Sequence, residues 1–281
     1  MDLICDTNVW YDIAAGRRDP AALKRPGHRL LATPVSFVEI ASELSDDTFA
    51  ERSGAARAVV SYADEIVLDT ERHLAALWGL GVEPLTIDWM DAFKTVAMAS
   101  NCKEVRDGVP DHAERVIRKV RPEIAAWART HWPSFAADME VLVDGFFPGY
   151  LAARKRQRAK YASKERAKPF ADAAKLPEIE RYTALGTRAR AALNLDSPPG
   201  EPTDEELVRV AGLLQPYVRA YARYVLNCAT KYTPKPNDWG DLECFAYLQG
   251  HRRLLTRDER WLEVAAEADL GAWILDPEAK P

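Results

Sequence analysis

Short apolar segments that alternate with amphipathic segments occupy both ends of this chain. Each has the length and residue types of a buried strand, and each is followed by a segment with helical periodicity. Strands that alternate with helices form a mostly parallel sheet whose two faces are covered by helices. We therefore predict an α/β fold. The predicted strands are residues 2–5, 29–32, 65–69, 253–256 and 272–275.

The middle of the chain differs from both ends. Between residues 81 and 234 helical periodicity dominates and β-branched runs are few, and we find no fixed internal repeat. We predict one discontinuous α/β domain, residues 1–80 and 235–281, that is interrupted by an all-helical insertion, residues 81–234. Its predicted helices are 88–104, 111–131, 135–146, 150–166 and 204–229.

Composition narrows the class of protein. The chain has 281 residues, of which 47% are hydrophobic and 29% charged, as in an ordinary globular protein. No run of about 18 apolar residues is present, so we expect no membrane segment. The first ten residues lack the basic start and long apolar centre of a secretory signal. The four cysteines are far apart and form no Cys-x-x-Cys pair. We therefore expect a cytoplasmic protein.

One basic segment stands out against the net charge of −5. Residues 151–170 contain eight Lys or Arg and one Glu. This concentration favours contact with a polyanion or an acidic partner. It could bind RNA phosphates and stack a base, or it could be a solvated helix face or the dock of a protein inhibitor. The candidate nucleic-acid contacts are Arg154, Lys155, Arg156, Arg158, Lys160 and Tyr161.

Four acids stand at the ends of predicted elements. Asp6 directly follows the first strand, and Asp258 follows the end of the strand 253–256 by two residues. Glu39 stands three residues after Ser36, which is the spacing of a capping box at a helix start. Asp241 opens a helix predicted to run to residue 249. The carboxyl ends of parallel strands share one edge of a sheet, so we expect these acids to meet there.

Carboxylates gathered at one point repel one another unless a cation neutralises them. Ligand sets made only of oxygen atoms favour Mg²⁺ or Mn²⁺ over zinc. Such an ion can lower the pKa of a water molecule and stabilise charge on a phosphodiester. The acids therefore indicate metal-assisted phosphodiester hydrolysis.

Each acid also has a purely structural interpretation. Asp6 could be a turn residue after a strand, Asp258 the N-cap of the next helix, and Glu39 only the capping partner of Ser36. Asp238, three residues before Asp241, is either an N-cap or a further metal ligand. Two acids that end strands and two that open helices are together a less probable coincidence than any one of them.

The segments around these acids resemble the motifs of PIN-domain ribonucleases. Leu3-Ile-Cys-Asp-Thr-Asn-Val-Trp is similar to the opening strand of that family, and Pro34-Val-Ser-Phe-Val-Glu-Ile-Ala to its second motif. Asn237-Asp-Trp-Gly-Asp-Leu-Glu-Cys-Phe and Leu254-Leu-Thr-Arg-Asp-Glu-Arg-Trp are similar to the third and fourth. The resemblance covers about residues 1–80 and 235–278. The second and third acids stand much further apart here than in a compact PIN domain.

This resemblance implies a PIN-like parallel sheet and a Mg²⁺- or Mn²⁺-dependent endoribonuclease, often the toxin of a toxin–antitoxin pair. It implies an RNA substrate, a protein antitoxin as inhibitor, and a homodimer as an expected assembly. The four acids would be catalytic, with metal held by Asp6, Asp241 and Asp258, and with Asp238 as a further candidate ligand. The polar supports would be Asn8 and Thr256.

Other functions compete with this interpretation. A PIN-like scaffold could bind RNA or a protein without cutting, and a DNA-directed nuclease would use the same acids. A phosphatase of the haloacid dehalogenase type also begins with an Asp after the first strand. That class needs a second acid two residues later, where this chain has Asn8. We therefore set the phosphatase aside.

Overall fold

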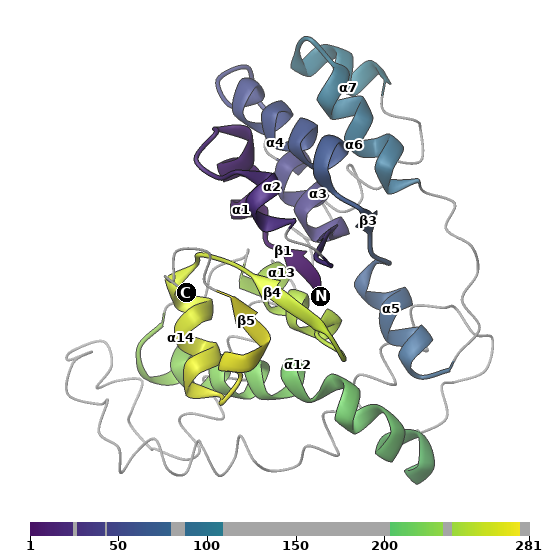
Figure 1. Cartoon of the computed structure of the whole chain (residues 1–281), viewed down its shortest axis with the longest axis vertical. Coiled ribbons are helices and arrows are strands. Elements are labelled where there is room, and N and C mark those ends of the chain that lie inside the picture. Colours follow the sequence, from purple (N-terminus) through teal and green to yellow (C-terminus); the bar gives the residue numbers. More distant parts are fainter. Residues whose placement is uncertain (25–26, 43, 80–87, 109–202, 233–237, 276–281) are drawn as a thin grey trace.

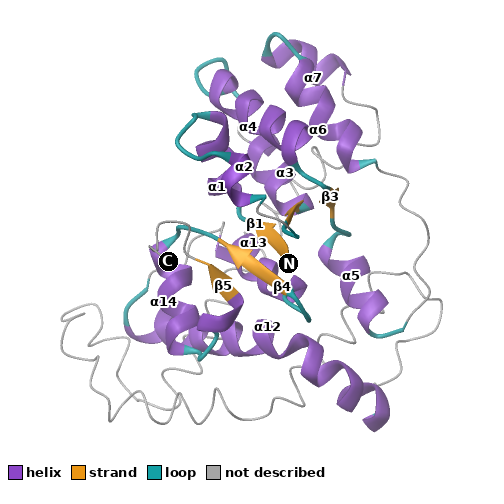
Figure 2. Cartoon of the chain, viewed as in Figure 1, coloured by secondary structure: helices purple, strands orange, loops and turns teal. Residues whose placement is uncertain are grey.

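Five parallel strands form a sheet at the centre of the molecule (Figures 1 and 2). The computed structural model describes residues 1–24, 27–42, 44–79, 88–108, 203–232 and 238–275. The strand order is β3-β2-β1-β4-β5, and all four pairings are parallel. This confirms the predicted α/β fold with a parallel sheet. The strands are β1 (Asp2–Cys5), β2 (Arg29–Ala32), β3 (Glu65–Ile66), β4 (Arg252–Leu255) and β5 (Ile274–Leu275).

Alternation along the central strand divides the core into two layers. Leu3 and Cys5 on β1 pack into one cluster of apolar side chains, whereas Ile4 between them packs into the other. Successive side chains of a strand point to opposite faces, so a continuous apolar run serves both layers. All four residues of β1 are buried.

Helices from residues 7–108 cover one face of the sheet (upper part of Figure 1). Phe37, on α3, makes ring contacts with Trp89 and Phe93, on α6. Gly16, two residues after α1, has a φ of 68°, a conformation that glycine adopts without steric cost. The helices in this part are α1 (Thr7–Ala14), α2 (Pro20–Leu23), α3 (Pro34–Ser42), α4 (Phe49–Tyr62), α6 (Trp89–Met98) and α7 (Cys102–Gly108).

The opposite face is covered mainly by segments from the second half of the chain. The longest helix among the described residues begins at a capping box in which Thr203 and Glu206 exchange hydrogen bonds. Tyr224 of that helix stacks on Trp261. The elements of this layer are α5 (Thr70–Leu77), α12 (Asp204–Thr230), α13 (Asp238–Glu243), the 3-10 helix η2 (Cys244–Tyr247) and α14 (Glu259–Glu267). A further 3-10 helix, η3 (Gly271–Trp273), precedes β5.

Both ends of the predicted insertion pack against the α/β core. Residues 89–98 and 102–108 lie in one layer of the core, and the 27-residue helix α12 lies in the other. Residues 109–202, with the predicted helices 111–131, 135–146 and 150–166, lie outside the described residues. The division into a domain and an insertion therefore stays a prediction.

Several predicted elements differ from those observed. The predicted helix 88–104 is divided into α6 and α7, and the predicted strand 272–275 is shortened to β5, which follows η3. The helix carrying Glu39 begins at Pro34, because Thr33 and not Ser36 caps it: Thr33 Oγ1 accepts from Ser36 N at 3.2 Å. The predicted strand 65–69 ends at Ile66, since Asp69 caps α5. The predicted helix 241–249 is instead the end of α13 followed by η2. Among the described residues, no helix combines the length and apolar character needed to cross a membrane.

The chain order of the strands reverses at β1. From β1 the chain moves outward to β2 and β3, and it later returns to place β4 on the other side of β1. In open parallel sheets, ligands bind outside the carboxyl ends of the strands at such a reversal. Asp6 follows β1 and Thr256 follows β4, so both stand at this point of the sheet.

Candidate metal centre

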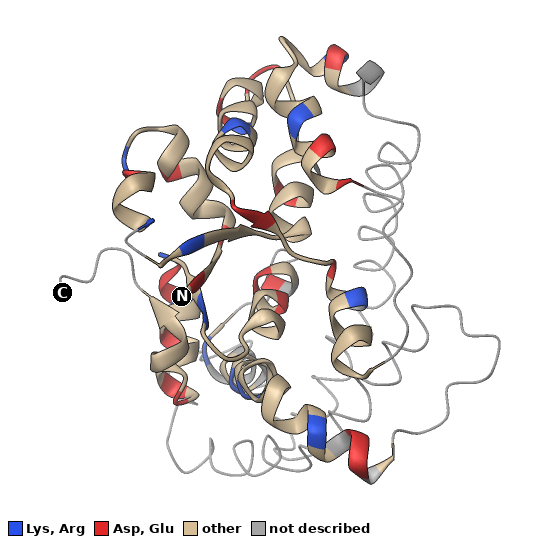
Figure 3. Ribbon diagram, turned by 45° about the vertical axis from the view of Figure 1, so that its right-hand side comes forward, with Lys and Arg blue, Asp and Glu red and all other residues tan. Residues whose placement is uncertain are grey.

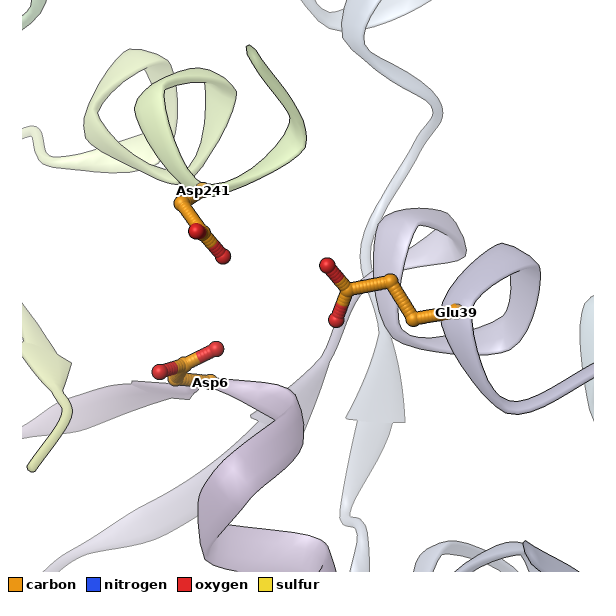
Figure 4. A group of neighbouring side chains, drawn as sticks. All are labelled: Asp6, Glu39 and Asp241. Carbon is orange, nitrogen blue, oxygen red and sulfur yellow. The ribbon is translucent and has the colours of Figure 1, made fainter. Parts of the chain in front are cut away.

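Three of the predicted acids converge beyond the carboxyl end of β1. Asp6, Glu39 and Asp241 each offer a carboxylate oxygen, and these oxygens all lie within 4.8 Å of one another. They come from three separate elements, which are the start of α1, the middle of α3, and α13. Figure 4 shows the three carboxylates pointing toward a common space. Asp241 stands more than two hundred residues after Asp6 and Glu39 in the sequence, so the fold and not local chain geometry brings the three acids together.

Asp6 is held by hydrogen bonds to both of its carboxylate oxygens. Its Oδ1 accepts from the backbone N–H of Thr7 at 2.7 Å, which caps α1. Its Oδ2 accepts from Asn8 Nδ2 at 2.9 Å and from Thr256 Oγ1 at 2.7 Å. Burial nevertheless raises the pKa of Asp6 above its ordinary value. Asn8 and Thr256, the predicted polar supports, thus fix the orientation of this carboxylate.

Glu39 projects from α3 on the other side of the space. Arg52, on α4, donates to the backbone carbonyls of Glu39 and Ile40 and so ties the end of α3 to α4. Burial, followed by the charge of Asp6, raises the pKa of Glu39 to about 7. The capping role that the sequence suggested for Glu39 is absent, because its helix starts at Pro34.

Asp241, on α13, is the third acid whose pKa is raised. Burial raises its pKa to about 9, and the charges of Asp6 and Glu39 act in the same direction. Gly240 lets α13 approach α3 closely. A Cβ atom at position 240 would lie 2.9 Å from Val35 Cγ1 and 3.9 Å from Glu39 Oε1. Glycine at this position therefore allows Asp241 and Glu39 to face each other.

Two further polar groups adjoin the acids, and sequence reasoning did not identify either as part of the site. The Thr7 hydroxyl and the Trp261 indole N–H are buried and make no hydrogen bond of ordinary geometry within the described residues. The Thr7 hydroxyl lies close enough to Glu39 to lower the pKa of that acid, and the Trp261 N–H does the same for Asp241. The only sequence signal was for Thr7, which stands inside Asp6-Thr-Asn. Nothing in the sequence pairs Trp261 with Asp241.

Asp258 lies near the three acids but outside their group. Its side chain caps α14 by accepting from Arg260 N at 2.8 Å. Its backbone N–H donates to Thr256 Oγ1 at 3.1 Å. The charge of Asp258 raises the pKa of each of the three acids, which shows that it is close to them. The N-cap interpretation of Asp258 is thus present in the structure, and its predicted part in metal binding stays a prediction.

Asp238 has other partners than the acidic group. Its Oδ2 accepts from the Tyr224 hydroxyl at 2.8 Å and forms an ion pair with Arg260. The carboxylate is buried, so these two donors compensate for the loss of water. This pairing joins α12, α13 and α14. Asp238 is not among the acids whose oxygens gather in the described part of the chain, and the structure gives it a role in packing.

The predicted nucleic-acid contacts belong to the predicted helix 150–166. Arg154, Lys155, Arg156, Arg158, Lys160 and Tyr161 all lie outside the described residues.

Gly240→Ala is expected to weaken metal binding by about tenfold, comparable to the loss of a group that orients a ligand. The new methyl group must push α13 away from Val35, and this separates Asp241 from Glu39. Alanine is a better helix former than glycine, so loss of helix propensity would not explain the effect. Calorimetric titration with Mn²⁺ measures it. Adding Val35→Ala should restore affinity, and failure of that rescue would contradict the steric explanation.

Comparison of the chain with protein-family models, with curated proteins and with solved structures finds no match.

Proposed function

We propose that this protein is a metal-dependent ribonuclease with a PIN-like fold that uses Mg²⁺ or Mn²⁺. The observation that carries the proposal is the gathering of Asp6, Glu39 and Asp241 within 4.8 Å at the reversal point of a parallel sheet. The motifs that resemble PIN domains supply these same acids, in the same order along the chain.

The residues present fit a hard divalent cation. All three ligand groups are carboxylates, which Mg²⁺ and Mn²⁺ prefer. The pKa values of Asp6, Glu39 and Asp241 are all raised, so their charged forms are disfavoured in the protein alone. A cation would remove this penalty. The buried Thr7 hydroxyl beside Glu39, which makes no other hydrogen bond of ordinary geometry in the described residues, adds an oxygen atom to the same space.

In this proposal the cation would polarise the scissile phosphodiester and favour ionisation of the attacking water. Asp6 and Asp241 would hold it. Glu39, which reaches in from α3, would complete the site or orient the attacking water. Thr256 and Asn8 keep the Asp6 carboxylate in one orientation through their hydrogen bonds to Oδ2. The carboxylate therefore would not need to reorient when the cation binds.

RNA is the proposed substrate because the arrangement Asp-Thr-Asn after β1, Glu39 on α3, and Asp241 on α13 resembles that of PIN-domain ribonucleases. A toxin role under the control of a protein inhibitor would follow from the same resemblance. The buried acidic group supports hydrolysis over binding alone, since three facing carboxylates are costly in a site that serves only as a scaffold.

The test is cleavage of labelled single-stranded RNA and of DNA of the same sequence, with Mg²⁺ or Mn²⁺ and with EDTA. Calorimetric titration with Mn²⁺ accompanies it. We expect metal binding, and RNA cleavage that EDTA abolishes. Cleavage of DNA but not of RNA would show that the substrate is DNA. Metal binding without any cleavage would leave a binding scaffold, and the absence of both would refute the metal centre.

A further inference from the structure

A buried carboxylate next to the metal centre holds two exposed arginines. Asp12 lies on α1, and its side chain is only 3% exposed. Its Oδ1 accepts from Arg17 Nε at 2.7 Å, and its Oδ2 faces Arg257 Nε at 3.3 Å. The Arg17 and Arg257 side chains are 54% and 40% exposed. One acid thus fixes two guanidinium groups side by side at the surface.

The arrangement carries a surplus positive charge. A single arginine would be sufficient to neutralise Asp12, and here there are two. Each uses its Nε atom for Asp12. No hydrogen bond from the terminal nitrogens of either arginine to another described residue is present. The two terminal nitrogens of a guanidinium form a planar fork that matches the spacing of phosphate oxygens. Asp12 therefore leaves two such forks available to solvent.

The position of the pair follows from the chain. Arg257 stands directly after Thr256, whose hydroxyl holds Asp6, and directly before Asp258. Asp12 stands six residues after Asp6 along α1, which corresponds to about 9 Å at the rise of an α-helix. Arg257 thus adjoins Thr256 and Asp258 in the chain, and Asp12 holds Arg17 next to Arg257.

Lys and Arg residues are spread over both helix layers and the sheet in the described part of the chain (Figure 3). The nearby acids repel a polyanion. A phosphate that approaches the metal centre thus needs a specific cationic contact, which this pair can provide.

We propose that Arg17 and Arg257, held by Asp12, bind a backbone phosphate of the nucleic acid next to the scissile one. The choice of nucleic acid as ligand rests on the proposed function, which this inference deepens. The two arginines do not recognise a base, since contacts to phosphate position a strand without specifying its sequence. It sets where the strand lies relative to Asp6, Glu39 and Asp241.

The experiment measures binding of an end-labelled oligouridine to the full chain by fluorescence anisotropy. EDTA is present so that the RNA stays intact, and salt is varied from about 50 to about 200 mM. Arg17→Gln and Arg257→Gln should each weaken binding about fivefold, and each should reduce the slope of log affinity against log salt by about 0.7. The charge-retaining Arg257→Lys should keep the slope but bind more weakly than the native chain, because lysine lacks the fork.

Arg29→Gln is the matched control. Arg29 is 48% exposed and pairs with Glu65 at the amino end of β2, which is the opposite edge of the sheet. It removes the same charge, and we expect it to leave the affinity and the slope within twofold of the native values. Thermal melts of each variant report on folding, because the Asp12 pairs also tie α1 to the segment after β4.

The outcomes separate this inference from the proposed function. The phosphate site would be contradicted if Arg17→Gln, Arg257→Gln and Arg29→Gln weakened binding equally, or if they changed only the melting temperature. It would also be contradicted if the native chain did not bind oligouridine. Cleavage in Mg²⁺ or Mn²⁺ with the same KM in all variants would support the nuclease and contradict the role of the arginine pair in binding. Binding that depends on the two arginines, without any cleavage, would support the phosphate site and contradict the nuclease function.

Discussion

Asp6→Asn is expected to reduce RNA cleavage about a thousandfold and to abolish measurable Mn²⁺ binding. Loss of one metal-holding carboxylate removes several kcal/mol of stabilisation, and about 4 kcal/mol corresponds to that factor in rate. Asparagine has nearly the same shape, and its oxygen can still accept from Thr7 N, so α1 keeps its cap. Its amide nitrogen then faces the donors Asn8 Nδ2 and Thr256 Oγ1. The change therefore removes the charge and disturbs the orientation together.

Asp88→Asn is the matched control for this variant. Asp88 caps α6 from an exposed position, and its side chain accepts from Met90 N and Asp91 N. Asparagine caps a helix about as well as aspartate, so this substitution should leave the cleavage rate within twofold. Rates come from single-turnover cleavage of labelled RNA in Mn²⁺. An Asp6→Asn protein that cleaves within tenfold of the native rate would contradict the assignment of Asp6 to the centre.

The parts of the site that the sequence predicted are those set by local signals. The ends of β1 and β2 agree with the predicted segments 2–5 and 29–32, because a short apolar run bounded by polar residues has few other ways to be buried. Parallel pairing of β1 and β4 then necessarily brings the residues that follow them to one edge. The hydrogen bond from Thr256 to Asp6 follows from that placement.

The parts that escaped prediction depend on contacts between distant segments. Asp238 has a capping position in the sequence, but its partners Tyr224 and Arg260 come from two other helices. The steric role of Gly240 depends on Val35, about two hundred residues earlier. The spacing Ser36-x-x-Glu39 fits a capping box, but the observed cap of α3 is Thr33, three residues earlier. Residue spacing alone does not distinguish two possible caps when burial of the helix determines where the helix begins.

Asp241→Asn is expected to stabilise the metal-free protein at pH 8, by about 5 °C in Tm. Burial and the charges of Asp6 and Glu39 raise the pKa of Asp241 from 3.8 to about 9 in the folded protein. Between these values the folded state binds more protons than the unfolded chain, so the free energy of unfolding falls as the pH rises. The native chain therefore loses stability through this window, and Glu39 adds to the loss from pH 4.5 to about 7. Asparagine removes the contribution of Asp241 to this loss, and about 2 kcal/mol corresponds to the stated shift.

The stabilisation of the variant has a counterpart in metal binding, which makes this prediction specific to a cation site. Mn²⁺ binds the charged form of the acids, so it should raise the Tm of the native chain, and more at pH 8 than at pH 5. Asp241→Asn should show little of this rise, because it has lost a ligand. Thermal melts at pH 5 and pH 8, with EDTA and with Mn²⁺, measure both effects, and Asp88→Asn should follow the native chain throughout. If Asp241→Asn melts below the native protein at pH 8 in EDTA, the acid contributes to packing. Repulsion between three buried carboxylates would then no longer support a cation at this site.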